Sequence, residues 1–125
     1  MPAFSALVLF AHGARDPSWA LPLHRLRSAL AASAPALRVE IAFLEMQTPA
    51  LPEVLAALAA QGCTAIAIAP VFWSQGGHVA KDLPPLLEGL GRTHPGLTLR
   101  VLPVLSELPG MMGFLAQALQ ALAQD

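Results

Sequence analysis

The sequence lacks most features that mark metal-cluster, nucleic-acid-binding or membrane proteins. Its single cysteine, Cys63, excludes an internal disulfide and any zinc or iron–sulfur site built from several cysteines. The formal net charge is −1, so the basic field that general nucleic-acid binding needs is missing. No apolar run reaches the ~20 residues of a membrane span without a proline or a charge, and the N-terminus lacks the basic start of a signal peptide. We therefore expect a cytoplasmic protein that binds neither nucleic acid nor membrane.

Several common catalytic sequence patterns are also missing. The chain has no dinucleotide-binding fingerprint, no Walker-type phosphate loop and no Gly-x-Ser-x-Gly nucleophile elbow. The sequence Ala11-His12-Gly13 lacks the preceding arginine of the Arg-His-Gly phosphatases, which argues against a phosphohistidine mechanism. We expect no organic cofactor.

The length and composition favour one globular domain over residues 1–125. A chain of this length buries roughly two-thirds of its unfolded surface, so it needs no disulfide or structural metal to fold. Hydrophobic residues make up 55% of the chain and charged residues only 12%. This composition suggests that another subunit covers part of the surface.

Short apolar runs alternate with longer helical segments along the chain, which predicts a βαβαβαβα order. Thr48-Pro49 is expected to cap the second helix, and Asp82 the third, with Pro84 and Pro85 in its first turn. One-helix connections are right-handed crossovers between parallel strands, so the expected fold is an α/β, flavodoxin-like, doubly wound sheet of order 2-1-3-4. The predicted strands are 5–11, 38–44, 64–71 and 97–104, and the predicted helices are about 17–33, 50–60, 82–90 and 109–123.

Two histidines and a glutamate follow three neighbouring strands of this predicted sheet. His12 follows the first strand, Glu45 ends the second, and His78 lies in the loop after the third. The first and third strands flank the point where the winding direction reverses, which is where such sheets bind ligands. Two imidazoles and one carboxylate suit cobalt, iron, nickel or zinc, and are too rich in nitrogen for magnesium or calcium.

Each residue also has a plainer interpretation. A histidine at a strand end can be a loop residue hydrogen-bonded to the backbone, and Glu45 can be an ordinary strand-end carboxylate. Gly77 allows backbone to approach a ligand, but glycine also simply makes turns. Arg15 could place a guanidinium at the mouth of the crevice or pair locally with Asp16. Lys81 lies near the start of the third helix, where anions are favoured.

Three motifs resemble the CbiX-type sirohydrochlorin chelatases, in the same order and spacing along nearly the whole chain. The sequence His12-Gly13-Ala14-Arg15-Asp16 is similar to the family's His-Gly-Ser-Arg-Asp opening, and Ala42-Phe43-Leu44-Glu45 looks like the second motif. The sequence Gly76-Gly77-His78-Val79-Ala80-Lys81-Asp82-Leu83-Pro84 resembles the third. Ala14 stands where serine is common, which removes one hydroxyl near the site. The length resembles the short, single-domain members of the class II chelatase superfamily.

The resemblance implies insertion of a divalent metal into sirohydrochlorin, on the way to cobalamin or siroheme. Cobalt or iron is implied as the metal substrate, and nickel is known for related short chelatases. The metal-binding histidines of the family carry over to His12 and His78, and the strand-end glutamate carries over to Glu45. We expect these three residues to bind the metal and to accept or relay protons, and Arg15, Gly77 and Lys81 to hold the carboxylates of the substrate.

The short form also implies a homodimer, because two-domain chelatases enclose the macrocycle between two similar halves. The apolar last helix is a candidate for the subunit contact, although packing on the sheet would explain at least half of its apolar residues. Three other functions stay open: a carrier that binds metal or tetrapyrrole without catalysis, a scaffold with a vestigial site, and a different enzyme on the same sheet.

Overall fold

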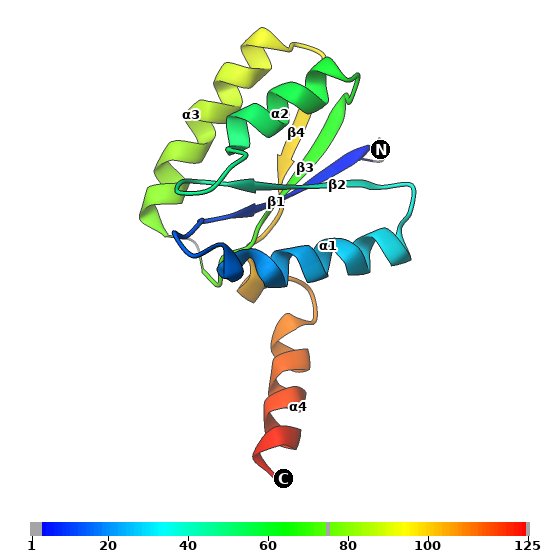
Figure 1. The fold of residues 1–125 in the computed structure, drawn as a ribbon, viewed down its shortest axis with the longest axis vertical. Helices are drawn as coiled ribbons and strands as arrows, with labels where there is room; N and C mark the ends of the chain where they lie inside the picture. Colours follow the sequence, from blue (N-terminus) through cyan, green and yellow to red (C-terminus); the bar gives the residue numbers. More distant parts are fainter. Residues whose placement is uncertain (1–3, 75, 125) are drawn as a thin grey trace.

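The strands and helices of a computed structural model follow the predicted order (Figure 1). It describes residues 4–74 and 76–124, and the side chains of residues 77–80 lie outside that description. Four parallel strands pair in the order β2-β1-β3-β4, which confirms the predicted sheet. These strands are β1 (Ala6–Ala11), β2 (Arg38–Phe43), β3 (Ala65–Pro70) and β4 (Thr98–Val101).

Helices cover the two faces of this sheet unequally. A 3₁₀ turn, η1 (Pro17–Ala20), leads into α1 (Leu21–Ser33), which packs chiefly on β2. Both α2 (Leu51–Ala60) and α3 (Gly77–Thr93) lie on the opposite face. Figure 1 shows α2 and α3 on one side of the strands and α1 on the other. Among the described residues, no helix is long and apolar enough to cross a membrane.

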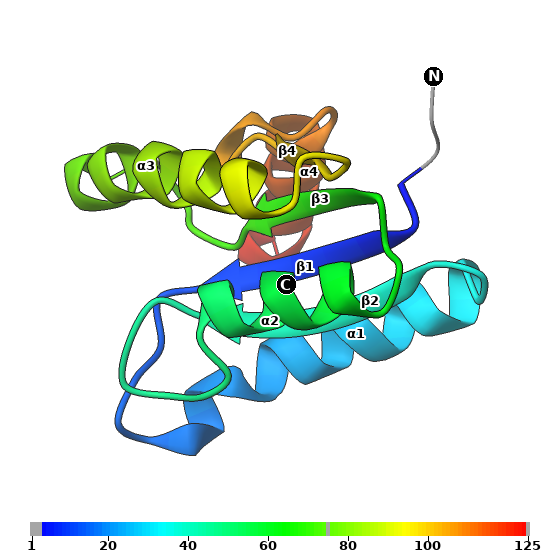
Figure 2. The same cartoon turned by 90° about the horizontal axis from the view of Figure 1, so that it is seen from above.

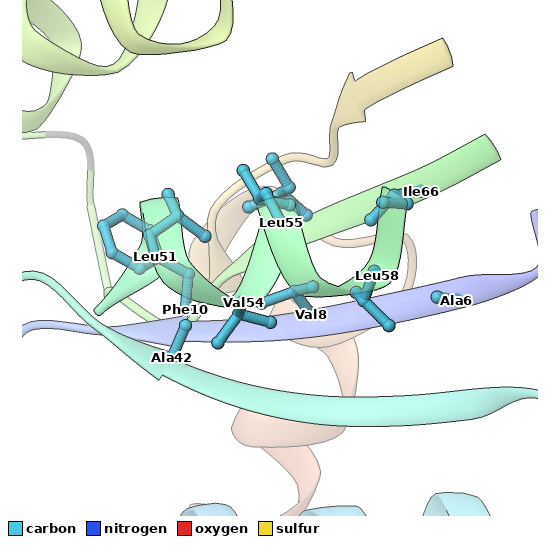
Figure 3. Close-up of a cluster of buried hydrophobic side chains, with 10 residues drawn as sticks. Ala6, Val8, Phe10, Ala42, Leu51, Val54, Leu55, Leu58 and Ile66 are labelled. Atoms are coloured by element: carbon cyan, nitrogen blue, oxygen red, sulfur yellow. The ribbon is translucent and has the colours of Figure 1, made fainter. Parts of the chain in front are cut away.

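β1 is the centre of the core because it pairs with both β2 and β3. Consecutive residues Val8, Leu9 and Phe10 are all buried, so this strand is apolar on both faces, as expected of a central parallel strand. Figure 3 shows the larger of two buried clusters, in which leucines and a valine of α2 pack over β1. Its buried members are Ala6, Val8, Phe10, Ala42, Leu51, Val54, Leu55, Leu58, Ile66 and Ile68.

The prediction for the third helix was wrong at its start. Gly76 is the N-cap and α3 begins at Gly77, so Asp82 lies inside the helix, and Gly77 and His78 belong to the helix instead of a loop. Gln75 lies outside the described residues. Pro84 and Pro85 therefore stand within α3, where each removes one backbone hydrogen bond. Tertiary packing compensates, because four leucines at helical spacing pack against the core: Leu83, Leu86, Leu87 and Leu90.

Other boundaries differ by smaller amounts. The N-cap of α2 is Ala50, so Thr48-Pro49 precedes the cap, and β4 ends at Val101 instead of continuing to residue 104. After β4 comes a 3₁₀ turn, η2 (Leu105–Glu107). Cys63 is partly buried and packs against the larger core cluster.

The last helix, α4 (Met111–Ala123), does not pack on the sheet. Its strongest contact is with η2, and none of its residues is buried. Figure 1 shows it extending away from the body on the side of α1. The prediction that at least half of its apolar residues pack on its own sheet is therefore wrong.

Candidate metal site at the carboxyl end of the sheet

His12 and Glu45 meet at the carboxyl end of the sheet because the β1–β2 ladder continues past both strands. Leu44 N donates to Ala11 O over 2.9 Å, and Glu45 N donates to His12 O over 3.1 Å. These bonds bring the two side chains to the same edge, where His12 Nε2 lies 3.7 Å from Glu45 Oε1. Both side chains are about half exposed, at 58% and 50%, so a ligand can reach them from solvent.

Two contacts orient the His12 imidazole. Its Nδ1 lies 3.4 Å from the carbonyl oxygen of Gly13, and its ring meets the ring of Phe72 edge-on with centroids 6.4 Å apart. Phe72 is in turn held edge-on against the buried Phe10, with centroids 5.6 Å apart. Nε2 is thus the ring nitrogen directed toward Glu45, and together the pair offers a nitrogen and an oxygen donor to one metal ion.

Gly13 allows the close approach of the two loops. Its φ is +92°, and a Cβ atom built there would lie 1.9 Å from the backbone oxygen of Glu45. The loop after β2 also has an unusual conformation at Met46, with φ 66°. Ala14 N donates to Gln47 Oε1 over 2.9 Å and ties the two loops together. The spacing of the His12 and Glu45 pair therefore depends on backbone contacts as well as on side chains.

A hollow of about 280 Å³ adjoins His12 on the α1 side of the sheet. It is lined by Ala11, His12, Gly13, Ala14, Trp19, Leu23, Phe43 and Gln47. Trp19 and Gln47 are two lining residues that the sequence did not predict. The sequence signal was a tryptophan two residues after Pro17, and the structure leaves this side chain exposed. A second hollow lies on the other side of the sheet and has an almost wholly apolar lining without histidine, so it offers no comparable donor set.

The remaining predicted site residues surround this edge. Arg15 is exposed in the loop after β1, and Lys81 is exposed on the first part of α3. The backbone places Gly77 and His78 at the first two positions of α3, which follows β3 beside β1. The His78 side chain lies outside the described residues. Among the side chains that are described, no three histidine, cysteine or acidic groups gather as a metal site.

Asp16 fixes the turn that follows this site. Its carboxylate accepts a hydrogen bond from Ser18 N over 2.9 Å and caps η1. That backbone hydrogen bond lowers the pKa of the Asp16 carboxyl below its usual 3.8. Because the ionised form is the one stabilised, this contribution to folding is complete at neutral pH and is lost as the pH falls through the lowered pKa.

Fold and site together define a doubly wound α/β protein with an imidazole–carboxylate pair at the carboxyl ends of β1 and β2, next to the switch point between β1 and β3. A sequence profile of the CbiX family matches residues 6–122. The chain belongs to the CbiX family.

Curated relatives show the same similarity over part of their length. The chain is 32% identical over 82 residues to the sirohydrochlorin cobaltochelatase of Methanococcus aeolicus, covering 66% of this chain and 57% of the relative. It is 34% identical over 82 residues to that of Methanocaldococcus jannaschii, with the same coverage. The matched region thus spans little more than half the length of these relatives.

Solved structures share the fold. A putative cobalamin biosynthesis CbiX protein from Marinobacter aquaeolei matches with a TM-score of 0.79 at 24% identity, over 95% of this chain and 97% of that one. The sirohydrochlorin chelatase SirB from Bacillus subtilis subspecies spizizenii, solved in complex with cobalt, matches with a TM-score of 0.67 at 25% identity. That match covers 78% of this chain and 42% of SirB, so this chain resembles less than half of the SirB chain.

Proposed function

We propose that this chain, as a single chelatase-like domain, inserts a divalent metal ion into sirohydrochlorin. The observation that carries the proposal is the approach of His12 Nε2 to Glu45 Oε1 at 3.7 Å, half exposed at the carboxyl end of a CbiX-family sheet. Cobalt(II) is the proposed metal, with iron(II) and nickel(II) as further candidates, because the matched relatives carry the name cobaltochelatase and SirB was solved with cobalt. The product would enter cobalamin or siroheme synthesis.

The donor set suits transfer of a metal better than storage. Insertion requires that the ion be held by few, exchangeable ligands and that two pyrrole protons be removed. A neutral imidazole at His12 can bind the ion or accept a proton, and Glu45 can act as an auxiliary ligand or relay. His78, two residues into α3, would supply the second imidazole. Three protein ligands leave coordination positions open for the macrocycle nitrogens.

Positive and backbone donor groups around the site fit the substrate's carboxylates. Arg15 and Lys81 are exposed near this edge, and Gly77 is the first residue of α3, where backbone N–H groups have no helical partner. We propose that these three residues anchor the rim of the macrocycle, and that a homodimer supplies a second wall, since one chain resembles less than half of SirB. A cytoplasmic location stays a prediction from the sequence.

Metallation of sirohydrochlorin tests the activity directly. Purified protein with sirohydrochlorin and cobalt(II) should accelerate the absorbance change of metallation above the spontaneous rate. Iron(II) and nickel(II), measured side by side, rank the metals. Tight binding of metal or macrocycle in a 1:1 ratio without turnover would instead identify a carrier, and no acceleration with any of the three metals contradicts the proposed enzyme.

Replacing Glu45 with glutamine should lower kcat/KM about tenfold, because it removes the negative charge and replaces one carboxylate oxygen with an NH2 group while preserving size. The matched control is Glu40→Gln on β2. Glu40 pairs with Arg27 and Arg38 at 3.8 and 3.4 Å, away from the strand end. Metallation rates for both variants show whether the loss is specific to Glu45. An equal loss in the two variants would indicate a general effect of acidic charge on the protein.

A further inference from the structure

Helix α4 has the composition of a buried helix but not the surroundings of one. Its thirteen residues include no charged side chain. Four large apolar side chains are more than half exposed: Met112 at 52%, Phe114 at 66%, Leu119 at 63% and Leu122 at 70%. A helix with this many apolar side chains normally has a covered apolar face, and exposed patches of this kind mark interaction surfaces.

The sheet is incompletely covered on the side from which α4 projects. There, the smaller core cluster has six buried members, and α1 packs chiefly on β2. Several apolar side chains packed against this cluster are only partly buried. We call four of them, from β1, from α1 and from β3 and the residue after it, the α1-side surface: Leu7, Leu30, Ala69 and Val71. Arg100 of β4, exposed and in register with Ala67, marks its polar edge.

We propose that α4 is an exchanged arm, which seats on the α1-side surface of a second copy of this chain. Both surfaces are apolar and lie on the same side of the molecule, so one two-fold axis can satisfy both at once. Figure 2 shows α4 nearly end-on, projecting from the strands instead of lying along them. The inference gives a structure to the homodimer in the proposed function, but it depends on no assumption about metal or substrate.

The area available is that of a stable dimer. A helix of 13 residues is about 20 Å long and about 10 Å across, so covering one side of it buries roughly 800 Å² on the two partners together. Reciprocal seating of two helices doubles this to about 1,600 Å², the size of a typical specific interface. A charged partner is disfavoured because α4 offers it no ionic contact, whereas a second copy presents an apolar surface.

The oligomeric state of the full chain tests the exchange. Light scattering at about 10 µM should give twice the 13.1 kDa of a monomer. The double variant Phe114→Asp/Leu119→Asp should be monomeric, with dimer affinity weakened at least about 100-fold because desolvated apolar anchors dominate such interfaces. The matched control, Ala57→Asp on an exposed position of α2, should stay dimeric. A monomeric wild type, or a dimer that survives the double variant, overturns the proposal.

Cross-linking then distinguishes exchange from simple pairing of two α4 helices. In a Cys63→Ala background, Leu26→Cys on α1 combined with Leu119→Cys on α4 should give covalent dimers with a short bis-maleimide. Leu119→Cys alone should not. If the Leu119→Cys variant alone cross-links equally well, the two α4 helices pair with each other, and seating on the α1-side surface is wrong. A dimer that neither variant cross-links also overturns this seating. Light scattering and cross-linking need neither metal nor substrate, so their failure would overturn the exchange and leave the proposed activity of His12 and Glu45 to the metallation assay.

Discussion

Replacing His12 with alanine should lower kcat/KM for cobalt insertion into sirohydrochlorin by a factor of about 100 or more while leaving the fold intact. The imidazole supplies the nitrogen donor of the pair with Glu45, and loss of a positioned general base typically costs 10²–10⁴ in rate. Its side chain is 58% exposed and contributes little packing, so the melting temperature should change only slightly.

The control for this variant is His24→Ala. His24 is exposed on α1, and Ser28 Oγ donates a hydrogen bond to its backbone oxygen, which the substitution preserves. Metallation by this variant should match the wild type, and cobalt(II) binding measured by calorimetry should weaken in His12→Ala alone. If His12→Ala keeps wild-type turnover, the site lies elsewhere and the proposed chemistry is wrong.

Replacing Gly13 with alanine should destabilise the protein by about 3 kcal/mol or more. Two costs add at this position: a φ of +92°, which side chains rarely adopt, and a Cβ 1.9 Å from the Glu45 backbone oxygen. For a domain of this size, the loss corresponds to a fall in melting temperature of at least about 8 °C. Because the clash is with the residue that faces His12, metallation should fall as well.

Gly62→Ala separates the two costs. Gly62 has nearly the same φ, +93°, but no atom lies within 4 Å of a Cβ built there. This variant should lose only the conformational part, about 1 kcal/mol, with unchanged metallation. Thermal unfolding of both variants measures the difference, and equal destabilisation would mean that the contact between the two loops does not constrain the site.

The sheet could be predicted from the sequence because the features that produce it lie along the chain. Apolar runs such as Val8–Phe10 are buried on both faces, and single-helix connections between them permit only a parallel, right-handed arrangement. The same rule predicted that His12 and Glu45 follow neighbouring strands. Their separation of 3.7 Å could not be predicted, because it depends on the backbone contact between Gly13 and Glu45 and on Gln47 binding Ala14.

The start of α3 shows how tertiary packing can override a local signal. Pro84 and Pro85 predict a helix that begins at Asp82, since proline is tolerated in a first turn. The structure begins the helix at Gly77, because leucines on one face of α3 pack against the core and offset the missing hydrogen bonds. The shift places Gly77 and His78 at the helix N-terminus.

The sequence by itself determined the strand order and the edge of the sheet at which His12, Glu45 and His78 follow their strands, because periodicity and crossover handedness act along the chain. Only the tertiary structure decided how closely His12 approaches Glu45 and which surface α4 leaves uncovered. An apolar helix has the same sequence pattern whether it packs on its own sheet or on another copy. The outcome depends on where the η2 turn directs it, which no local pattern encodes.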